Sequence, residues 1–215
     1  MSHFFIDLVS RTDEARRSFE THPVVLDAVA NGMSLDRYRA LLSELYSLVL
    51  HFNPGCAVAA SRMTDRFPAV RSFLYEHMHE ESGHETWVLD DLEAIGVARD
   101  RVLSYAPSPH VLALNGYNYW AADRKHPCSI LGMMYVLEVI ASVYGGPFSA
   151  AMRETLLLQG DRGISFISSH STLDAQHMAQ LREVLNLVEE ADAQSAIVES
   201  VLFNFHHITN VFGSV

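Results

Sequence analysis

Apolar residues recur at intervals of three and four along almost the whole chain, and no run alternates between apolar and polar at every second position. The first spacing places side chains on one face of an α-helix, whereas alternation is typical of a half-exposed strand. We therefore expect an all-α fold, a bundle of seven to eight helices. With 215 residues, 49% of them apolar, the chain is long enough to bury a substantial core as one domain, residues 1–215.

Cap and turn residues predict several helix boundaries. Ser34 is a candidate N-cap for a helix that ends before Asn53, and a second helix should run from Pro68 to Ile95. Gly83 falls inside that second helix, which suggests the close approach of a neighbouring helix or a ligand. The other predicted helices cover residues 109–126, 128–144, 148–158, 163–191 and 193–212.

Charge and cysteine usage exclude several classes of function. The chain has 15 basic and 26 acidic residues, a formal charge of −11, and no basic cluster, so nucleic acid is not an expected partner. Its apolar runs are too short to span a bilayer, and its first residues lack the order of a signal peptide, so we expect a cytoplasmic protein that does not bind membranes. Cys56 and Cys128 form no spaced motif and are expected to be reduced.

The stretch EHMHEESGHE concentrates histidine and glutamate inside the second predicted helix. His77, Glu81 and His84 have the spacing H-x3-E-x2-H. At roughly 100° per residue, these positions fall within an arc of about 60°, so their side chains should share one helix face. The other charged side chains of the stretch should lie at the edge of this face or in solvent: Glu76, His79, Glu80 and Glu85.

A second stripe and a buried carboxylate complete a candidate metal site. His170, Asp174 and His177 repeat the pattern as H-x3-D-x2-H, far along the chain. Glu138 lies in the most apolar segment, which we expect at the centre of the bundle, where a carboxylate must be protonated, paired or bound to a cation. Imidazoles and carboxylates on facing helices are typical ligands of iron or manganese in helical bundles.

Each of these features alone also has a purely structural explanation. A single histidine and glutamate stripe arises often by chance and usually lies on a solvated surface, and Glu138 alone is also explained as a neutral, hydrogen-bonded carboxylic acid. The conjunction of two stripes with a core carboxylate is much less easily explained by chance. It favours the metal-binding interpretation.

Longer stretches resemble the heme-oxygenase-like superfamily, which includes heme oxygenase, thiaminase II, the pyrroloquinoline quinone synthase and the heme-oxygenase-like diiron oxidases. The resemblance rests on HPVV followed by NGMSLDRYRALLSELYSLVLHF, on EESGHETWVLDDLEAIG and on YVLEVIASVYGG. It runs along nearly the whole chain. It implies an all-helical domain and, by analogy with the family, a homodimer.

Five residues resemble the iron ligands of the diiron oxidase branch: His84, Glu138, His170, Asp174 and His177. This resemblance implies two non-heme iron ions, with manganese as an alternative. It also implies an oxidase or oxygenase that uses O2 on a small organic substrate, of the amino-acid, amine or fatty-acid type.

The remaining ligand of that branch is a carboxylate on the helix that carries His84. His77 stands where many relatives have glutamate, and Glu81 is the alternative place for the carboxylate. The sequence leaves open which of the two binds metal, and whether one or two ions bind.

Other branches of the superfamily imply other functions. A heme oxygenase needs a proximal histidine, for which His22 is the candidate, and a thiaminase II needs a reactive cysteine. The quinone-synthase branch oxidises without metal, so a metal-independent oxidase or a small-ligand-binding protein is the alternative function. Candidate pocket residues are Arg37, Tyr38, Tyr46, Tyr117, Tyr119, Trp120 and Tyr144. Tyrosine and tryptophan at helical spacing are, however, more often simply core residues.

Overall fold

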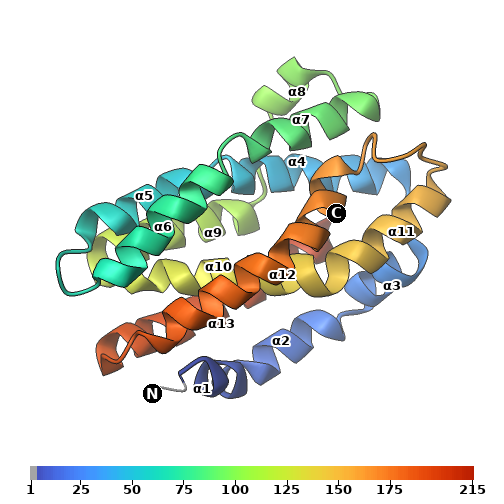
Figure 1. The fold of residues 1–215 in the computed structure, drawn as a ribbon. Helices are drawn as coiled ribbons and strands as arrows, with labels where there is room; N and C mark the ends of the chain where they lie inside the picture. Colours follow the sequence, from blue (N-terminus) through green and yellow to red (C-terminus); the bar gives the residue numbers. More distant parts are fainter. Residues whose placement is uncertain (1–3) are drawn as a thin grey trace.

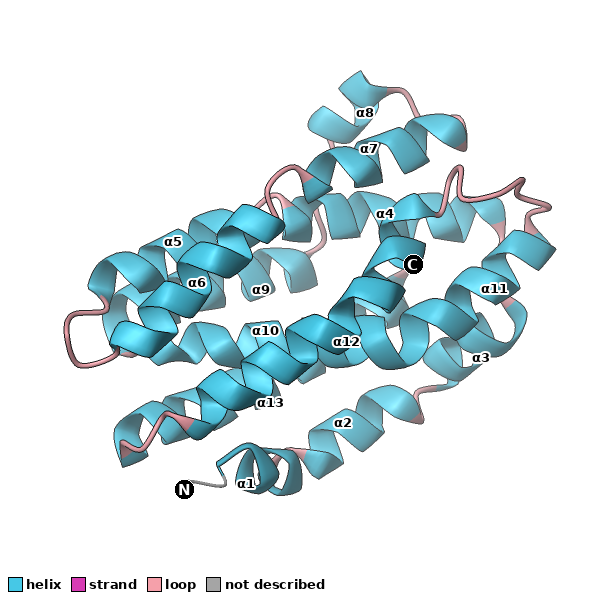
Figure 2. Cartoon of the chain, viewed as in Figure 1, coloured by secondary structure: helices cyan, strands magenta, loops and turns pink. Residues whose placement is uncertain are grey.

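The computed structural model is an α-helical bundle (Figures 1 and 2). It describes residues 4–215, and for residues 172–176 it describes the backbone but not the side chains. The described residues contain no strand, which confirms the predicted all-α fold. The α-helices are α1 (Phe4–Arg11), α2 (Asp13–Glu20), α3 (Pro23–Asn31), α4 (Leu35–Val49), α5 (Phe52–Arg62), α6 (Pro68–Glu80), α7 (His84–Ala94), α8 (Arg99–Leu103), α9 (Pro109–Trp120), α10 (Ile130–Ile140), α11 (Gly146–Thr155), α12 (Ser165–Asn186) and α13 (Ala191–Ser214). Two π-helices, η1 (Ala121–Lys125) and η3 (Ala141–Gly145), and a 3-10 helix, η2 (Pro127–Ser129), extend α9 and flank α10.

The predicted N-cap of α4 is confirmed, because the Ser34 side chain accepts a hydrogen bond from the Arg37 backbone N–H at 3.4 Å. The predicted end of this helix before Asn53 is confirmed, since α4 ends at Val49, but a new helix, α5, begins at Phe52 and includes Asn53. Pro54 falls in the first turn of α5, where the missing N–H would have no helical partner in any case. Additional helices that the sequence analysis did not separate, such as α5, explain why the described chain has more helices than predicted.

The predicted continuous helix from Pro68 to Ile95 is wrong. It is divided into α6 and α7 by a turn at residues 81–83. Gly83 has φ +92°, a left-handed conformation that residues with a Cβ rarely adopt, yet an added Cβ would meet no atom of the described residues within 4 Å. Gly83 therefore favours the turn through its φ angle, and none of the described residues makes the close approach expected there.

The most apolar helix, α10, lies at the centre as predicted and packs against α12 and α13 (Figure 1). At Gly132 an added Cβ would lie 2.6 Å from the Ile197 carbonyl oxygen, so this glycine permits the close packing of α10 on α13. The helical stretch Pro127–Thr155 is long and apolar enough to cross a membrane, but 67% of its most apolar window is buried inside the protein. Such burial is typical of a core helix.

Candidate metal centre

Four helices bring the predicted ligands together. His77 lies in the last turn of α6, Glu81 caps the C-terminus of that helix, and His84 is the first residue of α7. Glu138 projects from α10, and His170 and His177 from α12. The side chain of the seventh predicted ligand, Asp174, lies outside the described residues.

The first group of ligand atoms consists of Glu81, His84 and His170, whose donor atoms all lie within 4.8 Å of one another. Glu81 Oε2 is 2.7 Å from His84 Nδ1 and 3.5 Å from His170 Nε2. The two imidazole nitrogens are 3.2 Å apart. One carboxylate and two imidazoles thus converge on one point, although they come from opposite sides of the helix break and from α12.

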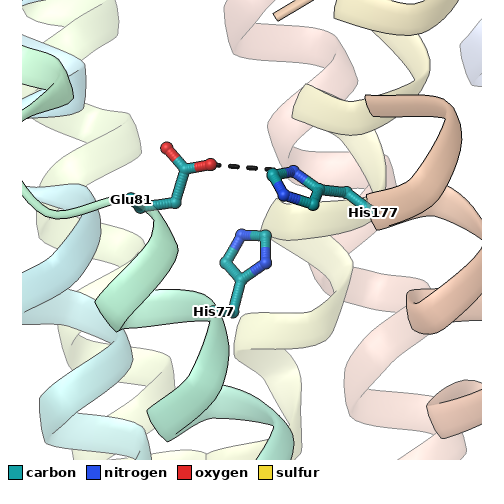
Figure 3. Close-up of side chains that lie close together, drawn as sticks. All are labelled: His77, Glu81 and His177. Atoms are coloured by element: carbon teal, nitrogen blue, oxygen red, sulfur yellow. Dashed lines mark ion pairs between the residues drawn. The ribbon is translucent and has the colours of Figure 1, made fainter. Parts of the chain in front are cut away.

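The second group consists of His77, Glu81 and His177, which also lie within 4.8 Å of one another (Figure 3). Glu81 Oε1 is 3.7 Å from His177 Nδ1. Glu138 Oε1 adjoins the same group, at 3.5 Å from His177 Nδ1 and 3.8 Å from His77 Nε2. This group therefore offers two imidazoles and two carboxylates.

Glu81 belongs to both groups through different oxygen atoms. Oε2 faces His84 and His170, while Oε1 faces His177. Burial by itself would raise the pKa of this carboxyl, but the hydrogen bonds with His170 and His84 outweigh burial and hold the pKa below its usual range. Glu81 is thus an ionised carboxylate placed between two sets of imidazoles, which is the position of a bridging ligand.

Buried polar atoms without partners show that the donor set fits a metal ion. Both ring nitrogens of His77 and Glu138 Oε2 are buried and make no hydrogen bond among the described residues. Burial lowers the pKa of His77 to about 4, so at neutral pH its imidazole is uncharged and has a free lone pair. Burial also raises the pKa of Glu138. Buried polar groups of this kind are costly unless a ligand or cation satisfies them.

Further residues orient these ligands, and the sequence did not single them out. The Phe166 carbonyl oxygen lies 2.7 Å from His170 Nδ1, and Glu80 Oε2 is 3.4 Å from His177 Nε2. The ring of Trp87 stacks on that of His84, with centroids 4.0 Å apart. Glu80 was expected outside the stripe, and it reaches the site because α12 packs beside the end of α6. For Trp87 a sequence signal was available, because this residue follows His84 by one helical turn and so could be expected to contact it.

A cavity of about 150 Å³ adjoins the ligands. His77, Glu81, Glu138 and His170 form part of its wall, and Tyr144 is the candidate pocket residue that also lines it. Almost all the remaining described lining is aliphatic or phenyl, and α4 and α10 contribute most of it, with smaller parts from α3, η3, α12 and α13.

The other candidate pocket residues are not among the described residues that line this cavity. Tyr38 is fully buried and its hydroxyl donates to the Gly163 carbonyl oxygen at 2.8 Å, so it fastens the bundle. Tyr46 is likewise buried core, while Arg37 Nε donates to the Val215 carbonyl oxygen at 3.0 Å. The last three lie on α9: Tyr117 stacks on Phe203, Tyr119 hydrogen-bonds with His51, and Trp120 is exposed. Aromatic residues at helical spacing pack the core in the same way whether or not a pocket is near.

Comparisons with known proteins agree with this architecture. A family model described as "iron-containing redox enzyme" matches residues 39–204. A solved domain of unknown function with a heme oxygenase-like fold, from Shewanella denitrificans, is 25% identical, with a TM-score of 0.84 over 95% of this chain and 88% of that chain. None of the curated proteins matches the chain.

Two more distant structures show the same fold. A TenA homologue from Pseudomonas syringae is 14% identical, with a TM-score of 0.84 over 99% of this chain and 92% of that chain. Heme oxygenase-1 from Synechocystis, solved in complex with heme, is also 14% identical, with a TM-score of 0.79 over 99% of this chain and 91% of that chain. The chain therefore has the heme-oxygenase-like fold expected from its sequence.

Proposed function

Because the chain belongs to the family of iron-containing redox enzymes, we propose that it is a non-heme diiron oxidase or oxygenase that uses O2 on a small organic substrate. The observation that carries the proposal is the position of Glu81, whose two oxygens face two separate groups of imidazoles. One iron would be held by Glu81, His84 and His170. The other would be held by Glu81, His77, His177 and Glu138, and the sequence adds Asp174 as a ligand. Sites that combine two imidazoles with carboxylates suit ferrous iron. With open coordination positions, such iron would bind O2 and supply electrons.

The chain itself prepares these ligands. Because Phe166 O lies 2.7 Å from His170 Nδ1, it accepts that ring N–H, so Nε2, which faces Glu81, is the nitrogen that would bind an ion in place of a proton. The lowered pKa of His77 keeps its imidazole in the neutral form that a metal requires. The apolar wall of the cavity excludes bulk water from the side of the cluster where substrate would lie.

Two alternative functions, heme oxygenase and thiaminase, have less support from the structure. The cavity of about 150 Å³ is too small for heme, since an engineered cavity of that volume in another protein accommodates benzene and heme is several times larger. His22, the candidate heme ligand, is also not among the residues that line the cavity. A thiaminase-like reaction needs a reactive thiolate. Cys56 and Cys128 are both buried, and burial raises the pKa of the Cys128 thiol to about 12.

Anaerobic loading with Fe(II), followed by iron analysis, tests the proposal. We expect two irons per chain and, on exposure to O2, a change in the optical spectrum. Glu81→Ala should abolish both irons, because both groups lose their shared carboxylate. His79→Ala is the matched control in the same stretch, since His79 is exposed and should leave iron content unchanged. A folded chain that takes up no iron would refute the proposal.

A further inference from the structure

Asp91 is a buried carboxylate on α7 that is not one of the predicted ligands, although it lies one heptad after His84. It is 2% exposed. Its Oδ1 accepts hydrogen bonds from the Ser165 backbone N–H and hydroxyl, both at 2.9 Å, and its Oδ2 accepts from the Phe166 N–H at 2.8 Å. Both carboxylate oxygens thus bind the first two residues of α12, so this side chain fastens α7 to the start of α12.

The start of α12 has no cap of its own. The residue before the helix is Ile164, which makes no side-chain hydrogen bond to it. The first N–H groups of a helix have no carbonyl partner within the helix, and the helix dipole favours a negative charge beside them. Asp91 therefore does from another helix what Ser34 does locally for α4. Where α12 begins is set by a contact between two helices.

The helix that carries Asp91 is itself positioned separately from α6. The turn at residues 81–83 interrupts the chain before α7, so the direction of α6 does not set that of α7. At the far end of α7, Arg39 Nε of α4 donates to the Ile95 carbonyl oxygen at 2.9 Å. This contact holds the end of α7 on α4, and Asp91, one turn earlier, holds α12 on α7.

A short path leads from Asp91 to a predicted ligand. Phe166, whose N–H is bound by Asp91, lies in the first turn of α12, and its carbonyl oxygen is 2.7 Å from His170 Nδ1. The Phe166 ring also lies against the His170 ring, with centroids 4.3 Å apart. Phe166 therefore contacts the His170 imidazole through both its backbone and its side chain. A displacement of the first turn of α12 would rotate or shift that imidazole.

The geometry points to Asp91 as a positioning residue of the metal centre, which fixes the register of α12 on α7 and, through Phe166, the orientation of His170. His84 on α7 and His170 on α12 meet at 3.2 Å beside Glu81, and sliding one helix along the other would separate them. Asp91 acts through these helices and is not itself a ligand. The inference rests on the proposed function, because the register matters to an ion only if both imidazoles bind it.

Glu44 provides a matched control, because it is a second buried carboxylate, 3% exposed, that binds the start of another helix. It accepts from the Ser108 N–H at 3.0 Å and from the Ser108 hydroxyl at 3.0 Å, at the N-terminus of α9. α9 carries no predicted ligand. Loss of Glu44 should therefore reproduce the cost of losing a buried cap without the effect on metal.

Co(II) titration of Asp91→Asn and Glu44→Gln, followed by the visible absorption of the bound ion, tests this role. An amide has one acceptor oxygen where the carboxylate has two, so Asp91→Asn leaves Ser165 or Phe166 facing an NH2 group. Asp91→Asn should weaken Co(II) binding by about 10–100-fold and alter the ligand-field bands, whereas Glu44→Gln should leave both unchanged. In urea unfolding without metal the two variants should lose comparable stability, because each loses one buried acceptor.

The outcomes separate this role from the proposed function. Wild-type affinity and spectrum in Asp91→Asn, or equal changes of metal binding in the two variants, would overturn the role of Asp91 while the wild type still binds metal. A wild-type protein that binds neither Co(II) nor Fe(II) would overturn the proposed function and this role together.

Asp91→Glu serves as a second variant if Asp91→Asn fails to fold. It keeps the carboxylate but adds one methylene, so the same oxygens cannot meet Ser165 and Phe166 unless α12 shifts relative to α7. We expect a folded protein with weaker Co(II) binding and shifted ligand-field bands, which would support precise positioning. Wild-type affinity and spectrum in a folded Asp91→Glu protein would overturn it, because a carboxylate at either distance would then suffice.

Discussion

Replacing His77 by phenylalanine should stabilise the metal-free protein while removing a metal ligand. Both ring nitrogens of His77 are buried without a hydrogen-bond partner among the described residues, and each such atom costs about 1–3 kcal/mol. The ring already lies between Phe52 and Phe73, with centroids 5.7 and 5.5 Å away, so a phenyl ring would extend an aromatic cluster. After a cost of about 1 kcal/mol for the larger ring, we expect a gain of about 2 kcal/mol, or about 4–8 °C in Tm.

The gain should increase as the pH falls. Burial lowers the pKa of His77 to about 4 in the folded protein, against about 6.5 in the unfolded chain. Between these values the unfolded chain binds a proton that folded His77 does not, so the wild type loses stability as the pH drops from about 6.5 to about 4. The whole effect is about 3 kcal/mol. The phenylalanine variant lacks this proton uptake.

Urea unfolding of chelator-treated protein at pH 7.5 and pH 5.5 measures both effects. Added Fe(II) should reverse the order of stability at pH 7.5, because it binds the folded wild type more tightly than the variant. His79→Phe is the control at an exposed position and should change stability by less than about 0.5 kcal/mol. A metal-free His77→Phe protein that is less stable than the wild type, or a difference that does not vary with pH, would refute the reasoning.

Three further substitutions probe the frame of the site. Gly132→Ala should lower the free energy of unfolding in urea by about 3 kcal/mol, because the new methyl group would lie 2.6 Å from the Ile197 carbonyl oxygen. A decrease of less than about 1 kcal/mol would contradict the close packing of α10 on α13. Gly83→Ala should cost only about 1–2 kcal/mol, since φ is +92° but space is available, and a larger loss in thermal unfolding would indicate a steric clash. Glu138→Gln should lower the iron content yet leave the metal-free circular dichroism spectrum unchanged, and full iron content in the variant would exclude Glu138 as a ligand.

Much of the candidate site was predictable because its signals are local. The helix period, the Ser34 cap and the two stripes of histidine and carboxylate are set by residues close together in the sequence. The break at Gly83 was missed although it is also local, because a glycine inside a helical pattern is tolerated at modest cost and carries no sign of its φ angle. The break does not disperse the ligands, since His77, Glu81 and His84 still converge across it.

The sequence by itself determined the all-α class, the central place of α10 and the residue types available as ligands, because periodicity and hydropathy act within each helix. Only the tertiary structure decided that His77 and Glu81 lie together in one cluster, with Glu81 between two groups of imidazoles. It alone revealed Asp91 at the start of α12 and the apolar cavity beside the ligands. These features depend on how helices distant in the chain pack against one another, and the rotation and register of that packing are not encoded in any single helix.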